Sequence, residues 1–172
     1  MTLPTNAPRP TVLLVDDTPD NLTIIGELLS PHFTVKLANT GERGLKIAQS
    51  ETPPDLILLD IMMPGLDGFE VCRRLKAFGP TRDIPVIFLT ALSDTGDMHF
   101  GFGLGAVDYV TKPVVPQVLL ARVRVHLALK AAADRLHTRA ATLEEQTAQC
   151  AREIVALRAV VADMENLLGK GI

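Results

Sequence analysis

The chain lacks the features that mark several large classes of protein. It has two cysteines among 172 residues, Cys72 and Cys150, which are too few for a disulfide framework and have no ligand-like Cys/His spacing around them. We therefore expect a reducing compartment. The formal net charge of -3 offers no excess of positive charge, so neither nucleic acid nor an anionic membrane surface is an expected partner.

Long hydrophobic runs are also missing. No apolar segment approaches the roughly 18 residues of a membrane-spanning helix. Residues 1–10 form a leader with three prolines, expected to be extended and flexible, and it lacks the apolar core of a signal peptide. These absences predict a soluble, cytoplasmic protein. The hydrophobic residues, 47% of the chain, are ample for one buried core with some length left over.

Short apolar runs alternate with amphipathic stretches as far as Pro116. Three runs are continuously apolar, which is typical of strands buried on both faces of a parallel sheet. A fourth alternates as an edge strand would, and a fifth is shorter. In that order, the predicted strands are Thr11–Val15, Leu56–Leu59, Val86–Leu89, Phe33–Ala38 and Ala106–Val110.

The stretches between the strands have the apolar spacing of helices. The predicted helices cover Asp20–Leu29, Gly41–Gln49, Gly68–Phe78 and Asp94–Leu104. Glycines in and beside the last of these lower its helical propensity by about 1 kcal/mol each, so we expect it to be short, frayed or mobile. The alternation of strands and helices predicts a doubly wound α/β domain.

Polar residues follow the predicted strands where ligands bind in an open parallel sheet, beyond the carboxyl ends. They are Asp16, Asp17, Asp60, Thr90 and Lys112. Any one aspartate after a strand is more often a turn former or a helix cap, but five such residues at successive strand ends favour a shared site. Three crowded carboxylates need positive charge, which a hard cation such as Mg²⁺ would supply. A carboxylate can also act as a nucleophile and form an aspartyl phosphate.

Three segments carry a family resemblance. Val12–Asp17 (VLLVDD), Leu58–Gly68 (LLDIMMPGLDG) and Tyr109–Pro113 (YVTKP) resemble the signatures of response-regulator receiver domains of bacterial two-component systems. The resemblance covers about residues 10–128. It implies a flavodoxin-like, five-stranded parallel sheet in the order 2-1-3-4-5.

The resemblance also implies a metal and phosphorylation site. Asp60 matches the residue that accepts the phosphoryl group. Asp17 matches the direct ligand of Mg²⁺ or Mn²⁺, and Asp16 matches the acidic partner that acts largely through water. Met62 stands where the family uses a backbone carbonyl on the metal.

The remaining matches concern the switch. Thr90 matches the hydroxyl that turns toward the phosphoryl group, and Ala91 is its small neighbour. Lys112 matches the phosphate-binding lysine, and Lys112-Pro113 resembles the family's cis peptide. Tyr109 matches the aromatic side chain that changes rotamer on activation; as a bare pattern it could equally be a half-exposed strand tyrosine.

After Pro116 the chain has no glycine or proline until Gly169, so this tract predicts one long helix. Apolar or small residues recur in a heptad pattern, which favours a parallel two-stranded coiled coil from about Leu129 to Leu168. The alternative is a single helix folded back on the receiver. The d positions are Leu129, Leu136, Leu143, Cys150, Leu157 and Met164, and the a positions are Ala133, Ala140, Thr147, Ile154, Val161 and Leu168.

The predicted division of the chain is a leader over 1–10, a receiver domain over 11–128, a dimerising helix over 129–168 and a tail over 169–172. The expected function is a phosphorylation switch, in which a histidine kinase or phosphotransfer protein phosphorylates Asp60 and the dimeric helix responds. The chain is not expected to be an enzyme beyond gaining and losing its own phosphoryl group. No helix-turn-helix follows the receiver, so direct DNA binding is not expected.

Two alternatives remain open. The chain could be a constitutive dimeric adaptor that uses the receiver only as a docking surface. It could also be the regulatory fragment of a cyclic dinucleotide enzyme. Residues 16–22 and 122–127 resemble regulators that carry HD-GYP phosphodiesterase or diguanylate cyclase modules.

Overall fold

The computed structural model describes residues 9–91 and 101–169, with side chains as far as residue 166. It divides into two compact units, residues 1–130 and 131–172. The elements are β1 (Thr11–Val15), α1 (Pro19–Leu29), β2 (Thr34–Ala38), α2 (Gly41–Ala48), β3 (Leu56–Asp60), α3 (Gly68–Ala77), the 3-10 helix η1 (Gly79–Thr81), β4 (Val86–Thr90), β5 (Asp108–Thr111) and α5 (Pro116–Gly169).

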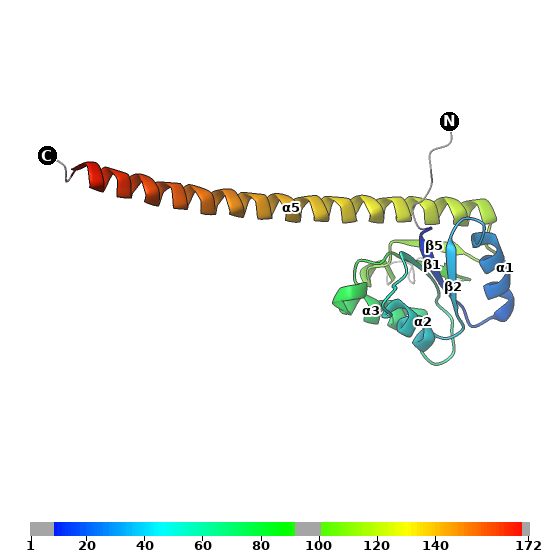
Figure 1. The fold of residues 1–172 in the computed structure, drawn as a ribbon. Helices are drawn as coiled ribbons and strands as arrows, with labels where there is room; N and C mark the ends of the chain where they lie inside the picture. The colour runs from blue at the N-terminus through cyan, green and yellow to red at the C-terminus, as the bar shows by residue number, and fades with distance from the viewer. Residues whose placement is uncertain (1–8, 92–100, 170–172) are drawn as a thin grey trace, which may run out of the picture. The chain divides into compact units, whose positions relative to one another are not determined.

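The first unit contains a five-stranded sheet in the order β2-β1-β3-β4-β5, and every neighbouring pair is parallel (Figure 1). This confirms the flavodoxin-like order. The three continuously apolar strands β1, β3 and β4 lie in the middle, where both faces are covered. The alternating strand β2 lies at an edge, as its pattern predicted.

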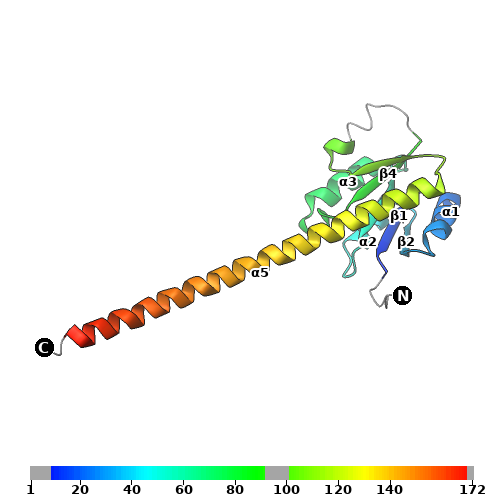
Figure 2. The same ribbon diagram turned by 90° about the horizontal axis from the view of Figure 1, so that it is seen from above.

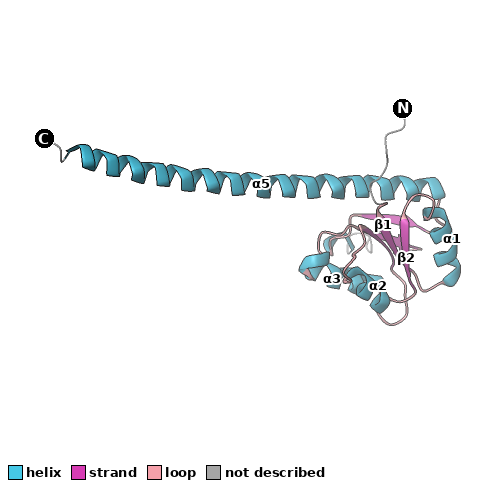
Figure 3. Ribbon diagram, viewed as in Figure 1, coloured by secondary structure: helices cyan, strands magenta, loops and turns pink. Residues whose placement is uncertain are grey.

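Helices cover both faces of this sheet, so the core has two layers (Figure 3). On one face, Cys72 and Leu75 of α3 pack with the side chains of β1, β3 and β4. On the other face, α1 lies beside the start of α5 (Figure 2), and Leu29 of α1 belongs to the same buried cluster as residues of α5. Those α5 residues are spaced four apart on one side of the helix, and burial of each contributes roughly 1.5–3 kcal/mol; they are Leu119, Val123 and Leu127.

Most predicted element boundaries agree with the structure to within a residue. Strands β3 and β4 each run one residue further than predicted and end on Asp60 and Thr90 themselves. Strand β5 begins at Asp108, two residues later than predicted, because the Ala106 N–H donates to the Gly101 carbonyl and closes a turn there. Of the helix predicted over Asp94–Leu104, residues 101–103 are helical, and residues 94–100 lie outside the described part.

Gly68 allows α3 to start against the end of β3. A Cβ atom at this position would lie 2.2 Å from the Asp60 carbonyl oxygen and 2.8 Å from the Ile61 Cα atom. Both are backbone atoms and cannot move aside cheaply. The preceding residue, Asp67, caps the helix by accepting a hydrogen bond from the Glu70 N–H at 2.8 Å. A side chain at residue 68 would therefore push α3 away from the backbone of Asp60 and Ile61.

The long helix predicted after Pro116 is confirmed as α5. In the second unit, every side chain from Ala133 to Glu165 is exposed, including the apolar ones. This stretch therefore buries no apolar side chain against its own chain. No helix in the described part of the protein is both long enough and apolar enough to cross a membrane.

Candidate functional site

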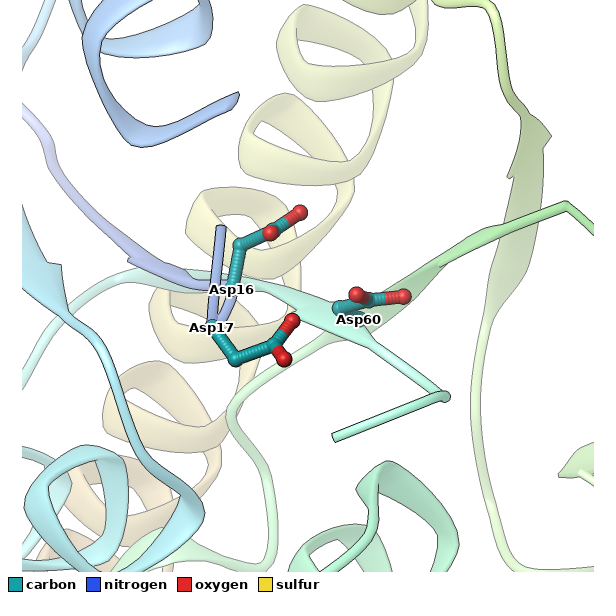
Figure 4. Close-up of side chains that lie close together, drawn as sticks. All are labelled: Asp16, Asp17 and Asp60. Carbon is teal, nitrogen blue, oxygen red and sulfur yellow. The ribbon is translucent and has the colours of Figure 1, made fainter. Parts of the chain in front are cut away.

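The carboxyl ends of the central strands bring three carboxylates together (Figure 4). Asp16 and Asp17 follow β1, and Asp60 is the last residue of β3. One ligand atom from each lies within 4.8 Å of the others. Asp16 is fully buried and Asp60 is 4% exposed, whereas Asp17 is half-buried. The topology thus assembles the acidic cluster that the strand ends predicted.

Lys112, which follows β5, joins two of these carboxylates. Its Nζ atom lies 2.8 Å from Oδ2 of Asp16 and 3.0 Å from Oδ2 of Asp60. Burial alone would lower the pKa of Lys112, but the hydrogen bonds and charges of the two aspartates outweigh burial and raise it. The lysine therefore remains a cation at neutral pH. The Lys112-Pro113 peptide bond is cis.

Asp60 lies in a setting that disfavours its charge. Burial raises its pKa, and the neighbouring Asp16 raises it further; the hydrogen bond from Lys112 and the Met62 N–H offset this only in part. Three carboxylates against one ammonium leave negative charge uncompensated at the strand ends. Carboxylate oxygens at this spacing fit a hard divalent cation such as Mg²⁺. The Met62 side chain is 64% exposed, and its N–H lies 3.4 Å from Oδ1 of Asp60.

The residues matched to the switch lie on β4 and β5. Thr90 is buried, and Ala91 is exposed. Tyr109 is only 7% exposed, which excludes the alternative of a half-exposed strand tyrosine in this conformation. Its ring packs against Phe88 and Phe102, with centroids 5.3 and 4.9 Å away.

Tyr109 lies directly against Gly101. A Cβ atom on Gly101 would lie 1.6 Å from the Tyr109 hydroxyl oxygen. The absence of a side chain at residue 101 is thus what admits the tyrosine to this position.

Sequence reasoning missed Asn21, which lies in the first turn of α1. Its Nδ2 atom is 3.0 Å from both carboxylate oxygens of Asp16. An asparagine near a helix start is common for local reasons, so the sequence carried no signal for this contact.

A second group that the sequence did not indicate links β5 to α5. Arg122 donates a hydrogen bond to Oδ1 of Asp108, and Nε2 of His126 lies 3.1 Å from Oδ2 of the same carboxylate. The backbone N–H of Tyr109 also donates to Asp108, at 2.8 Å. Arg122 and His126 are four residues apart and so share one side of the helix. The sequence shows this spacing of Arg122 and His126, but it does not show that Asp108 is their acidic partner.

Comparison with known proteins assigns the family. The model of the response regulator receiver domain matches residues 12–124. The "Probable cyclic di-GMP phosphodiesterase" of Vibrio cholerae is 45% identical over 126 residues, which cover 73% of this chain and 28% of that protein. The response regulator PleD of Caulobacter vibrioides is 42% identical over 132 residues, which cover 76% of this chain and 29% of that protein.

A solved structure agrees with these relatives. The signal receiver domain of an HD domain-containing protein from Pseudomonas fluorescens superposes with a TM-score of 0.69 at 26% identity and covers 78% of this chain and 98% of that one. The chain spans less than a third of the length of the Vibrio cholerae and Caulobacter vibrioides relatives. With its sheet order, its acidic strand ends and the match over residues 12–124, the chain belongs to the response regulator receiver family.

Proposed function

We propose that this protein is a phosphorylation-dependent response regulator in which Asp60 accepts a phosphoryl group from a histidine kinase or a phosphotransfer protein in the cytoplasm. The observation that carries the proposal is the position of Asp60 at the end of β3, 3.0 Å from the Lys112 ammonium and within the acidic cluster. Residues 11–128 form the receiver in this proposal, and residues 129–168 form the helix that it controls.

The reaction is a transfer between two nucleophiles. A carboxylate oxygen of Asp60 forms a bond to phosphorus, while the bond from phosphorus to the donor atom breaks and the donor keeps the electron pair. Lys112 neutralises charge on the phosphoryl oxygens, and the Thr90 hydroxyl donates a hydrogen bond to one of them. Positioning and charge compensation are the main demands of phosphoryl transfer, and these residues meet both.

The acidic residues would hold Mg²⁺ or Mn²⁺. Asp17 and Asp60 are the proposed direct ligands together with the Met62 backbone carbonyl, and Asp16 acts on the cation largely through water. When bound, the cation supplies positive charge that draws the phosphoryl oxygens toward Asp60. Because the Met62 side chain points largely to solvent, a change of this side chain should leave cation binding intact.

Labelling at Asp60 tests the function directly. Wild type, Asp60→Asn and Asp20→Asn are incubated with acetyl phosphate and Mg²⁺, and the added phosphoryl mass is measured by intact mass spectrometry. We expect labelling of wild type and of Asp20→Asn, whose exposed carboxyl group serves as the matched control, and none of Asp60→Asn. A chelator should abolish the labelling. Equal labelling of Asp60→Asn and wild type, or labelling that is indifferent to chelator, would disprove the proposal.

The signal is proposed to leave the site through Thr90 and Tyr109. Thr90 and Tyr109 lie on adjacent strands, and Tyr109 contacts Phe102 in the segment before β5. A hydrogen bond from Thr90 to the phosphoryl group is a contact present in only one state, as a two-state switch requires. Amide hydrogen exchange should therefore change most within residues 91–110 on phosphorylation. Unchanged exchange there, with Asp60 fully modified, contradicts this route.

The proposed output is a dimer formed through α5. The predicted d positions Leu129, Leu136 and Leu157 are 60%, 69% and 65% exposed, and the a positions Ile154 and Val161 are 51% and 53% exposed. Leu143, Met164 and Cys150 of the same stripe are exposed as well, and the Leu168 side chain lies outside the described part. A long apolar stripe left uncovered by its own chain favours a second copy as the partner.

A second candidate function is the regulatory part of a cyclic dinucleotide enzyme. The observation that favours it is the relative named as a phosphodiesterase, of which this chain covers 28%. The reading frame that follows residue 172 in the gene tests this candidate, because a cyclic dinucleotide enzyme would encode a catalytic module there. A constitutive adaptor is distinguished separately, because its dimerisation and partner binding would be the same for Asp60→Asn and the phosphorylated wild type.

A further inference from the structure

The Asp16 carboxylate is surrounded by hydrogen-bond donors of its own chain. Its Oδ1 atom accepts from the Thr18 backbone N–H at 2.9 Å and from the Asn21 amide at 3.0 Å. Its Oδ2 atom accepts from the same amide at 3.0 Å and from Lys112 at 2.8 Å. A carboxylate offers roughly four acceptor positions, so each position of Asp16 has a donor nearby.

The two side-chain donors to Asp16, Lys112 and Asn21, differ in whether they also contact Asp60. Lys112 is shared, because it also lies 3.0 Å from Asp60, the proposed phosphoacceptor. Once a phosphoryl group is attached to Asp60, the lysine is needed on the phosphoryl oxygens. Asn21 lies in the first turn of α1, and its amide bridges both oxygens of Asp16. Among the described contacts, it donates to no other carboxylate of the site. A fully buried carboxylate that lost the lysine and had no amide would keep only the Thr18 N–H.

We infer that Asn21 is a positioning residue that holds the Asp16 carboxylate in one orientation independently of Lys112. The lysine can then move from Asp16 to the phosphoryl group while the buried Asp16 carboxylate keeps hydrogen bonds from Asn21 and the Thr18 N–H. This inference rests on the proposed function and assigns the residue that prepares the acidic site for it. Asn21 acts only through Asp16, so its effect depends on which other donors Asp16 retains.

The expected consequence is a loss of cation affinity when the amide is removed. Changes to residues that orient a metal-binding side chain typically weaken metal binding by about 10- to 100-fold. Asn21→Leu keeps the branched shape and the number of side-chain heavy atoms but cannot donate, and Asn21→Gln keeps the amide on a longer side chain. Thr23→Ala is the control on the same helix, because the Thr23 hydroxyl donates only to the Pro19 carbonyl and is exposed.

The test is Mg²⁺ binding by isothermal titration calorimetry, with the full chain and no phosphoryl donor. We expect Asn21→Leu to bind about 10-fold more weakly than wild type, and Thr23→Ala to match wild type. The loss should be larger in a Lys112→Met background, where Asp16 has lost both of its side-chain donors. The loss should disappear in an Asp16→Asn background. Equal affinity of Asn21→Leu and wild type, or an equal loss in all three backgrounds, overturns the inference.

A second measurement needs no variant and so does not depend on whether Asn21→Leu folds. The side-chain amide of Asn21 is followed by nuclear magnetic resonance before and after addition of Mg²⁺ and beryllofluoride. Slow exchange of its protons with solvent in both states is expected, because the amide stays on Asp16 while the lysine moves. Fast exchange in the beryllofluoride state would show that Asn21 leaves together with Lys112, which also overturns the inference.

The outcomes separate this inference from the proposed function. If wild type binds Mg²⁺ and is labelled on Asp60 while Asn21→Leu behaves identically, only the role of Asn21 is wrong. If wild type is not labelled at all, the proposed function fails, whatever Asn21 does to Mg²⁺ binding.

Discussion

At the scale of single residues, Gly101 and Gly103 offer a matched pair that tests the position of Tyr109. A Cβ atom on Gly101 would meet the tyrosine hydroxyl, whereas nothing lies within 4 Å of one on Gly103. Gly101→Ala should displace the Tyr109 side chain and cost about 1–3 kcal/mol of unfolding free energy, as overpacking does. Gly103→Ala should be neutral or slightly stabilising. Because the chain has one tyrosine and no tryptophan, its fluorescence reports on Tyr109 alone.

Iodide quenching of that fluorescence, together with urea unfolding, measures both expectations. Gly101→Ala should make Tyr109 more accessible to iodide, while Gly103→Ala should leave quenching as in wild type. Equal quenching and equal stability of the two variants would contradict a buried tyrosine packed against residue 101.

At the scale of elements, Asp108 fastens β5 to the first turns of α5 through Arg122 and His126. Burial alone would raise the pKa of Asp108, but hydrogen bonds from Arg122, from the Tyr109 N–H and from His126 outweigh burial and lower the pKa below its ordinary value. A depressed pKa stabilises the fold above the pKa of the unfolded chain, and this stabilisation is lost as pH falls through the folded value. The relevant window therefore lies below about pH 4.

The variant Asp108→Asn should remove this stabilisation. At pH 7 we expect it to be less stable than wild type by about 1–2 kcal/mol, which allows for the partial exposure of Arg122. The difference should shrink as pH falls below about 4, because protonation of wild-type Asp108 then removes the same charge. Urea unfolding between pH 7 and pH 3 measures it. A difference that stays constant with pH would show that the carboxylate charge contributes nothing to this junction.

At the scale of the whole molecule, we expect the heptad stripe of α5 to hold the proposed dimer together. Leu157→Asp with Val161→Asp places charge at neighbouring d and a positions and should give monomers in analytical ultracentrifugation. Val155→Asp with Ala159→Asp adds the same charge at the same spacing outside the stripe, and should remain dimeric. A Leu157/Val161 double variant that stays dimeric would show that another surface holds the two copies together.

Cysteine crosslinking tests the register of the same dimer. Cys150 is exposed and occupies a predicted d position, so a parallel, in-register pair would bring the two Cys150 thiols together. Cys72 is fully buried, and burial raises the pKa of its thiol to about 11, so it does not compete. Mild oxidation should give a covalent dimer of wild type and none of Cys150→Ser. An antiparallel or staggered pair would leave wild type uncrosslinked.

The sequence by itself determined the sheet and the chemical composition of the site. Continuous apolar runs at Thr11–Val15 and Val86–Leu89 are typical of strands covered on both faces, and this made the parallel sheet predictable. Parallel strands place their carboxyl ends on one edge, so the sequence predicted that Asp16, Asp60 and Lys112 would meet there. The long helix was predicted because no glycine or proline lies between Pro116 and Gly169.

Only the tertiary structure decided which of these groups touch, and how. Lys112 and Asp16 are 96 positions apart, and their 2.8 Å contact depends on the register of strands that no local pattern specifies. The same holds for Asp108 with His126. Asn21 reaches both oxygens of Asp16 because α1 begins shortly after the end of β1 and packs its apolar side on the sheet. Local periodicity determines the elements, whereas hydrogen bonds between elements depend on sub-ångström placement that only the packed core provides.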